Sequence, residues 1–225
     1  MDIKSMFKFD GTNAFNTFTN VLETLEWRIE KQLLKERVDK YKDNEFYLLL
    51  RQTFNDKRLS IWPLKEEEVI TWMDTLLIMR KTMIQLFKKG INGEKVKILM
   101  EYPLVFGNHM RTDYLIVYER LIIVLEFGMF NQDEKRSEER YTKKLQDSIT
   151  HRQVLRNMIS NDVIVVNYVL VYRPEFDRIH KMINKENIEY NHNEIKRLSD
   201  FIMHHVKHQD SLSAIAQLEM VQFYT

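Results

Sequence analysis

The sequence contains no cysteine, which excludes disulfide bonds and thiolate metal sites and suits a reducing cytoplasm, the compartment we expect. Only 5 glycines and 3 prolines interrupt its 225 residues, so long regular elements should dominate. No apolar run reaches membrane-spanning length, and residues 1–9 lack the apolar stretch of a signal peptide. We therefore expect a soluble protein without a membrane partner.

An excess of charge of one sign is also lacking, because 34 Lys and Arg residues stand against 33 Asp and Glu residues. A strongly basic chain would argue directly for nucleic acid binding, and that argument is missing here. The balance still allows a basic groove beside acidic helices. Hydrophobic residues make up 44% of the chain, which is enough to bury the core of one large domain or two small ones.

The first ninety residues have a helical pattern. Apolar residues recur at helical spacing in the first stretch, at Leu22, Leu25, Ile29, Leu33 and Leu34. A second helix is predicted over residues 45–54, and a third begins at the glutamates after Pro63 and runs to Phe87. The loop at 90–93 ends it. This loop predicts a boundary between a helical N-terminal region, 1–92, and a second region, 93–225.

Short β-branched and aromatic runs follow and predict strands at residues 96–100, 112–118, 121–127 and 163–172. Between the last two, a charged loop at 131–140 precedes a helix whose inner face carries Leu145, Ile149, Leu155 and Ile159. The chain from residue 175 to the end is helical again. This order predicts a mixed α/β fold, with a core sheet flanked by helices.

The polar pair Glu119-Arg120 separates two apolar runs and is the predicted turn of a β-hairpin. With the turn there, Asp113 lies directly opposite Glu126, with Cβ atoms roughly 4.5–5.5 Å apart. Like charges at that distance destabilise a hairpin, and a divalent cation such as Mg²⁺ would relieve them. The alternative is that the register differs by one residue, that one carboxylate is solvated, and that nothing binds.

Three motifs occur in order around this hairpin, and a fourth lies on the helix that follows: Glu101-Tyr-Pro-Leu, Arg111-Thr-Asp113, Val124-Leu-Glu126-Phe-Gly128 and Leu145-Gln146-Asp147. Their order resembles the core of the PD-(D/E)XK (restriction-endonuclease-like) nuclease superfamily, in particular the nuclease-like domains fused to some bacterial helicases. The resemblance covers residues 96–172. It implies a restriction-endonuclease-like core sheet and metal-dependent hydrolysis of phosphodiester bonds in DNA, with RNA left open, in phage defence or DNA processing.

The resemblance also implies roles for single residues. Asp113, Glu126 and the main-chain carbonyl of Phe127 would hold Mg²⁺ or Mn²⁺. Glu101 would lie beside them as an accessory catalytic carboxylate, and Gln146 would orient water or substrate. Arg111 matches the arginine of the family and would contact nucleic acid; the alternative is an ion pair with Glu101 or Glu119.

One position departs from the family pattern, because the expected lysine two residues after Glu126 is replaced by Gly128. In the first hypothesis the catalytic role has moved to Lys144 on the following helix, with Lys143 contacting nucleic acid. The alternative for both lysines is a solvated helix face. In the second hypothesis the chain is a catalytically silent module that binds nucleic acid or a protein partner. A homodimer, and a protein partner bound through the N-terminal helices, also stay open.

Overall fold

The structure of the chain, a computed structural model, describes residues 4–59, 63–104, 110–130, 133–175 and 185–222. Its strands are β1 (Phe7–Asp10), β2 (Val96–Pro103), β3 (Arg111–Tyr118), β4 (Leu121–Met129) and β5 (Ile164–Tyr172). Its helices are α1 (Thr12–Thr19), α2 (Val21–Thr24), α3 (Leu34–Tyr41), α4 (Glu45–Asp56), α5 (Glu66–Lys88), α6 (Glu134–Met158), α7 (Lys185–Ser211) and α8 (Ala214–Gln222).

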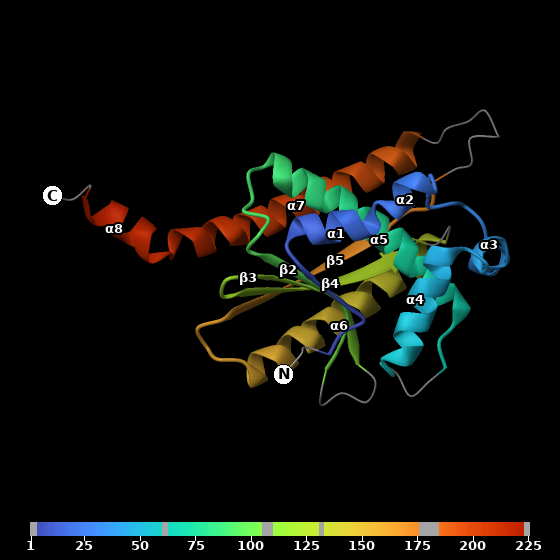
Figure 1. Cartoon of the computed structure of the whole chain (residues 1–225), viewed down its shortest axis with the longest axis horizontal. Coiled ribbons are helices and arrows are strands. Elements are labelled where there is room, and N and C mark those ends of the chain that lie inside the picture. The colour runs from blue at the N-terminus through green and yellow to red at the C-terminus, as the bar shows by residue number, and fades with distance from the viewer. Residues whose placement is uncertain (1–3, 60–62, 105–109, 131–132, 176–184, 223–225) are drawn as a thin grey trace.

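The strands form one sheet whose neighbours follow the chain order from β1 to β5. Among the first four strands each neighbouring pair is antiparallel, and β5 is parallel to β4. A parallel neighbour needs a crossover connection, and α6 provides it (Figure 1). The mixed α/β fold predicted from the sequence is confirmed, and the four predicted strands correspond to β2, β3, β4 and β5.

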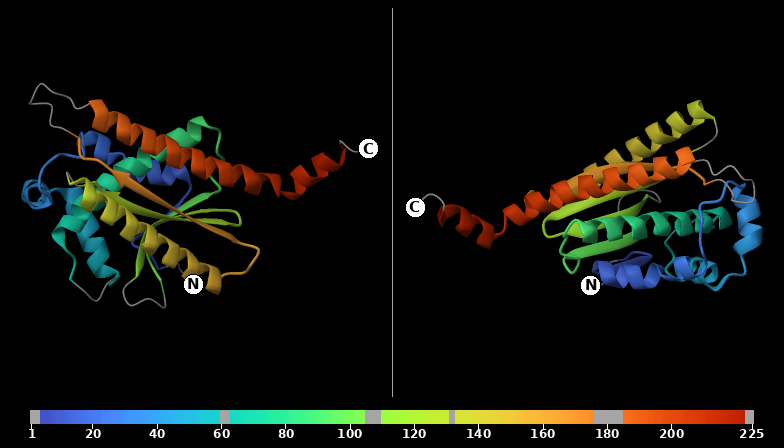
Figure 2. Two further views of the ribbon diagram at one scale, coloured as in Figure 1. Left: turned by 180° about the vertical axis from the view of Figure 1, so that it is seen from behind. Right: turned by 90° about the horizontal axis from the view of Figure 1, so that it is seen from above.

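Helices cover both faces of the sheet, as the two views in Figure 2 show. On one face, α1, α5 and α7 bury the larger apolar cluster, to which the strands contribute Ile116 and Ile123. On the other face, α6 covers a smaller cluster that includes Leu115 and Val124. Successive side chains of a strand point to opposite faces, which explains why adjacent residues of one strand belong to different clusters.

The β3–β4 hairpin has the register that the sequence predicts. Tyr118 pairs with Leu121, so Glu119-Arg120 forms the turn. Glu119 has a φ of 50°, in the left-handed region used by tight turns. The same register brings Asp113 opposite Glu126 at the open end of the hairpin.

The second and third predicted helices are confirmed as α4 and α5. The first prediction, a helical stretch from Leu22 to Leu34, is wrong for residues 25–33. Helix α2 ends at Thr24, and Glu26, with a φ of 49°, turns the chain out of the helix. Residues 25–33 lie outside the helices. There Trp27 donates a hydrogen bond from Nε1 to Oδ1 of the buried Asp74, at 3.0 Å. This tertiary contact satisfies a buried carboxylate, which outweighs the local helical spacing.

The sequence does not predict β1, which lies inside the region expected to be helical. It extends the sheet by pairing with β2, with Phe7 opposite Met100. Buried residues from 1–92 and from 93–225 contribute to the same larger cluster. The division of the chain at residue 92 stays a prediction.

The charged loop predicted at 131–140 is wrong from Glu134 onward, because α6 begins there; residues 131–132 lie outside the described residues. Asp133 caps the helix by accepting a hydrogen bond from the Arg136 backbone N–H at 3.3 Å. The buried face of α6 also differs from the predicted apolar stripe. It consists of Ser137, Ser148, His151 and Leu155, of which Leu155 alone was expected.

The helical tail expected after residue 175 is present as α7 and α8, with residues 176–184 and 223–225 outside the described residues. Helix α8 extends away from the body of the molecule (Figure 1). Within the described part of the chain, no helix combines the length and the apolar character that crossing a lipid bilayer requires.

Candidate active site

Three neighbouring strands bring carboxylates to one end of the sheet. Glu101 lies on β2, Asp113 on β3 and Glu126 on β4. Glu101 and Glu126 are only 3% and 1% exposed, whereas the side chain of Asp113 is 26% exposed. Burial makes ionised carboxylates costly unless cations or hydrogen-bond donors surround them. The partners of these three groups therefore define the site.

Asp113 and Glu126 contact each other's strands. The backbone N–H of Asp113 donates to Oε1 of Glu126 at 3.4 Å, and the backbone N–H of Phe127 donates to Oδ2 of Asp113 at 2.7 Å. The two carboxylates thus lie side by side, as the hairpin register predicts. Burial raises the pKa of Glu126, and the charge of Asp113 raises it further. A raised pKa is expected when two carboxylates lie next to each other, because each disfavours the ionised form of the other.

Lys144 on α6 places its ammonium between the two carboxylates. Its Nζ lies 3.0 Å from Oδ2 of Asp113 and 2.9 Å from Oε2 of Glu126. Burial lowers the pKa of Lys144, but the charges of both carboxylates outweigh burial and raise it above its usual value. The ammonium therefore stays charged and offsets part of the repulsion between Asp113 and Glu126.

His151 is a member of the site that the sequence does not predict. Its Nδ1 lies 2.9 Å from Oε1 of Glu126, and the residue is 6% exposed. Lys144 and His151 are seven residues apart on α6, a spacing that puts both on the same helix face. That spacing is the signal that could have identified His151 once Lys144 was a candidate. Both Glu126 oxygens thus have a nitrogen partner on α6.

A second group of contacts surrounds Glu101. Nε1 of Trp72 donates to Oε1 of Glu101 at 2.8 Å, and Nε of Arg111 lies 2.8 Å from Oε2. Arg111 also forms an ion pair with Glu68. Burial raises the pKa of Glu101 to about 8, against the opposing effect of Arg111. The ion pair with Glu101 that the sequence offered as an alternative for Arg111 is therefore present.

Members of both groups line one cavity of about 650 Å³ at the end of the sheet, whereas Arg111, Glu126 and His151 lie behind its lining. Its walls include Glu101, Asp113 and Lys144. Lys143 also lines the cavity and is exposed to solvent. The volume lies within the usual range for small-ligand sites. The structure places seven of the predicted site residues at or next to this cavity: Glu101, Arg111, Asp113, Glu126, Phe127, Lys143 and Lys144.

Gln146 is the predicted site residue that the structure does not bring to the cavity. Its side chain is exposed, and it lies two residues from Lys144, which in a helix turns it away from the face that carries the ammonium. His151, rather than Gln146, is the α6 side chain that contacts Glu126 besides Lys144.

The capacity of this site for a metal ion follows from its donors and its charge. Among the residues that the structure describes, no group of three or more His, Asp or Glu side chains could hold a metal ion. Asp113 and Glu126 offer a two-carboxylate site, which suits Mg²⁺ because that ion retains several water ligands. The cavity lining combines acidic residues with basic ones, namely Glu68, Glu101, Asp113 and Asp147 with Lys65, Arg140, Lys143 and Lys144.

Comparison with known proteins adds no relative: no family model, no curated protein and no solved structure matches this chain. The fold defines a mixed α/β protein with a charged cavity at the end of its sheet. Its function has to be inferred from the chemistry of that cavity.

Proposed function

We propose that this chain is a metal-dependent nuclease that hydrolyses phosphodiester bonds, with DNA as its substrate. The observation that carries the proposal is the position of the Lys144 ammonium, within 3.0 Å of Asp113 and 2.9 Å of Glu126. A cation beside two carboxylates in a cavity is the arrangement that phosphoryl chemistry needs, because negative charge develops on the phosphate oxygens in the transition state.

Lys144 would take the role of the lysine that the family carries at the position of Gly128. It comes from α6 rather than from β4, but its Nζ reaches Oε2 of Glu126. A charged ammonium there can orient a water molecule and stabilise the developing charge on the phosphate. The resemblance of the motifs around Glu101, Asp113 and Glu126, and their strand order, supports the same assignment.

Asp113 and Glu126 are the residues that would hold Mg²⁺ or Mn²⁺, with the Phe127 carbonyl as a further oxygen donor. Bound there, the ion would supply a water molecule of lowered pKa and a Lewis acid for the phosphoryl oxygen. The chain itself contributes three functions. His151 fixes the orientation of Glu126, Arg111 holds Glu101 at the cavity wall, and Lys144 supplies the fixed positive charge.

A second candidate function is a catalytically silent module that binds nucleic acid or a protein partner. It is favoured by one observation: Lys144 and His151 already engage both oxygens of Glu126, so this carboxylate is satisfied without a metal ion. Such a module should bind nucleic acid in a salt-dependent manner, and binding should survive the loss of Asp113 and Glu126.

The test is the cleavage of supercoiled plasmid and of single-stranded circular DNA by the purified chain in Mg²⁺ or Mn²⁺, beside Asp113→Ala and Glu126→Ala. The proposal predicts metal-dependent cleavage by the wild type and its loss in both variants. Equal cleavage by all three proteins would indicate a contaminant, and the absence of cleavage of both substrates by a folded wild type would favour the silent module. Circular dichroism on each protein establishes that it is folded.

A further inference from the structure

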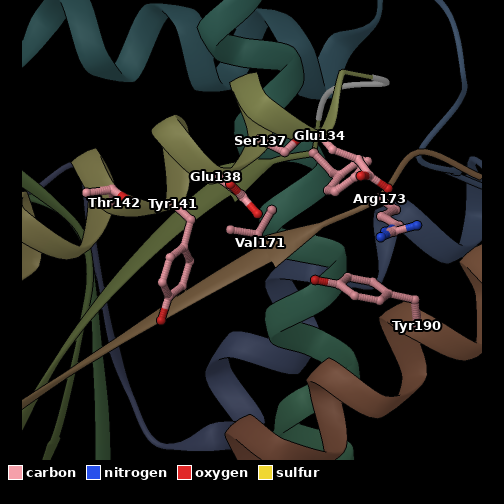
Figure 3. Close-up of a pocket in the computed structure, with 9 residues that line it drawn as sticks. Glu134, Ser137, Glu138, Tyr141, Thr142, Val171, Arg173 and Tyr190 are labelled. Carbon is pink, nitrogen blue, oxygen red and sulfur yellow. The ribbon is translucent and has the colours of Figure 1, made fainter.

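A second cavity lies at the free edge of the sheet, between α6, the end of β5 and the start of α7, and nothing in the proposed chemistry uses it (Figure 3). Its volume is about 580 Å³, large enough for a nucleotide-sized ligand. The residues that give it its chemistry are Phe130, Glu134, Glu138, Tyr141, Arg173 and Tyr190.

Arg173 forms one wall and is held rigidly. Its guanidinium carbon lies 3.9 Å from the centre of the Phe130 ring and 4.4 Å from that of Tyr190. The Asn191 side chain fixes the Arg173 backbone by accepting from its N–H at 2.9 Å and donating to its carbonyl at 2.7 Å. Nε of Arg173 is buried and has no hydrogen-bond partner within the described chain. The cavity therefore presents a positive charge whose position is set in advance.

The part of the lining that α6 contributes carries negative charge and an exposed ring. Glu134 and Glu138 lie one turn apart on α6, and Tyr141 is 45% exposed. Figure 3 shows Glu138 and Tyr141 extending from α6, and Tyr190 reaching toward them from α7. Within the described residues, the Tyr141 ring stacks on no other aromatic ring. An exposed aromatic ring at the wall of a cavity is a surface on which a flat ligand can stack.

The charges restrict the class of ligand. Arg173 would repel a cationic ligand, and Glu134 and Glu138 would repel an anionic ligand. A neutral, planar group that has both donors and acceptors satisfies both walls, because a carboxylate accepts from its amino groups and a guanidinium donates to its ring nitrogen or carbonyl oxygen. Nucleobases have this combination of planarity and mixed polarity.

We propose that this cavity binds an unstacked nucleobase of a single-stranded substrate, next to the phosphate that is cleaved. The inference rests on the proposed nuclease function, because it assumes that nucleic acid occupies the first cavity. Tyr141 and Lys144 are three residues apart on α6, which is about 4.5 Å along the helix axis. A phosphate at Lys144 and the unstacked base of a neighbouring nucleotide can therefore occupy the two cavities together.

The position of Arg140 supports this path. The residue directly precedes Tyr141 on α6, lines the first cavity and donates from Nη1 to the Met129 carbonyl at 3.1 Å. The two cavities are thus neighbours on α6, and a backbone phosphate that passes between them meets a guanidinium. Bases of an intact duplex stay stacked and cannot enter the second cavity. The preferred substrate is therefore single-stranded or has an extruded base.

The test is fluorescence anisotropy with a labelled oligonucleotide of about 12 nucleotides, single-stranded or annealed to its complement. Wild type is compared with Tyr141→Leu and Arg173→Met, in EDTA so that cleavage does not occur. Phe87→Leu removes a 70% exposed aromatic ring outside both cavities and is the matched control. Thermal melting of each variant verifies that it is folded.

We expect Tyr141→Leu and Arg173→Met to weaken single-strand binding roughly 5- to 150-fold, with duplex binding unchanged and Phe87→Leu equal to wild type. If Tyr141→Leu and Arg173→Met bind the single strand as tightly as wild type does, the base site is refuted while the nuclease proposal stands. If wild type binds neither oligonucleotide and does not nick plasmid, both proposals fall.

Discussion

The ammonium of Lys144 lies 2.9 Å from Oε2 of Glu126, although one residue belongs to α6 and the other to β4. Two positions after Glu126, Gly128 stands where the resembled family has its lysine. A cation thus reaches the carboxylates from the helix that covers this face of the sheet. The site thus has a positive charge beside both carboxylates, although position 128 carries no lysine.

Metal binding should stabilise the folded chain. If Asp113 and Glu126 hold Mg²⁺ or Mn²⁺, the ion adds about 2.7 kcal/mol to the free energy of unfolding at a hundredfold excess over its dissociation constant. Differential scanning calorimetry should therefore show a rise in the melting temperature of wild type with added metal, and no rise for Asp113→Asn. Asp162→Asn, at an exposed carboxylate paired with Arg120, serves as the control. An equal rise in Asp113→Asn would place the ion elsewhere.

A lysine at position 128 should partly replace Lys144. A Cβ atom there would lie 3.4 Å from Cγ2 of Val171 and 3.7 Å from Cγ of Arg140, which are ordinary contacts. Residues 126 and 128 share one face of β4, so a lysine at 128 extends on the side of Glu126. We expect the double variant Gly128→Lys/Lys144→Met to cleave plasmid faster than Lys144→Met alone. Equal residual rates in two folded proteins would contradict this.

The stability of the metal-free chain should fall as pH rises between about 4.5 and 8. Burial raises the pKa of Glu101 from 4.5 to about 8, so the folded state holds a proton that the unfolded state has lost in this range. The contribution of protonated Glu101 to the free energy of unfolding is complete below pH 4.5 and is lost as pH passes 8. Between these values the free energy of unfolding falls by at most about 1.4 kcal/mol per pH unit.

Urea unfolding in EDTA at several pH values measures this slope. Glu101→Gln cannot titrate at this position, so its stability should depend less on pH than that of wild type. The raised pKa of Glu126 has the same sign and leaves a residual slope. Identical slopes in wild type and Glu101→Gln would show that Glu101 is ionised in the folded chain.

The fully buried ion pair between Arg37 and Asp74 should contribute to the free energy of unfolding. Arg37 and Asp74 are both fully buried, with Nη2 of Arg37 2.7 Å from Oδ1 of Asp74. Replacing Arg37 by Met leaves the Asp74 charge without its main partner, which should cost about 3–5 kcal/mol in urea unfolding. Lys42→Met breaks the exposed pair with Asp39 and should cost less than about 1 kcal/mol. If Arg37→Met and Lys42→Met lowered the free energy of unfolding by similar amounts, the buried pair would be no more important for stability than the exposed one.

The sequence predicts the central part of this fold well, because the strands and the hairpin depend on local signals. The apolar runs define β2 to β5, and the polar pair Glu119-Arg120 sets the register that brings Asp113 beside Glu126. Lys144 was identifiable as a candidate because the family lysine is replaced by Gly128. The strands and the hairpin need only the alternation of side chains and turn chemistry, whereas the inference on Lys144 also needs the family resemblance.

The remaining features depend on tertiary contacts that local patterns do not encode. Trp27 leaves a helical pattern to contact Asp74, and β1 forms because β2 offers a free edge. The inner face of α6 is polar at Ser148 and His151, so the search for an apolar stripe assigned the wrong face. Gln146 was expected from the family resemblance, whereas His151, which contacts Glu126, belongs to no motif of that resemblance.

The most direct test of the central proposal compares Lys144→Met with Lys196→Met in a plasmid-cleavage assay at saturating Mg²⁺. Lys196 on α7 is exposed and lines neither cavity, so it is a matched control for the loss of one positive charge. We predict that Lys144→Met slows cleavage roughly 100- to 1,000-fold, as the loss of one transition-state donor does, and that Lys196→Met changes it only by a small factor. Equal rates for Lys144→Met and wild type, with both proteins folded, would contradict the catalytic role of Lys144.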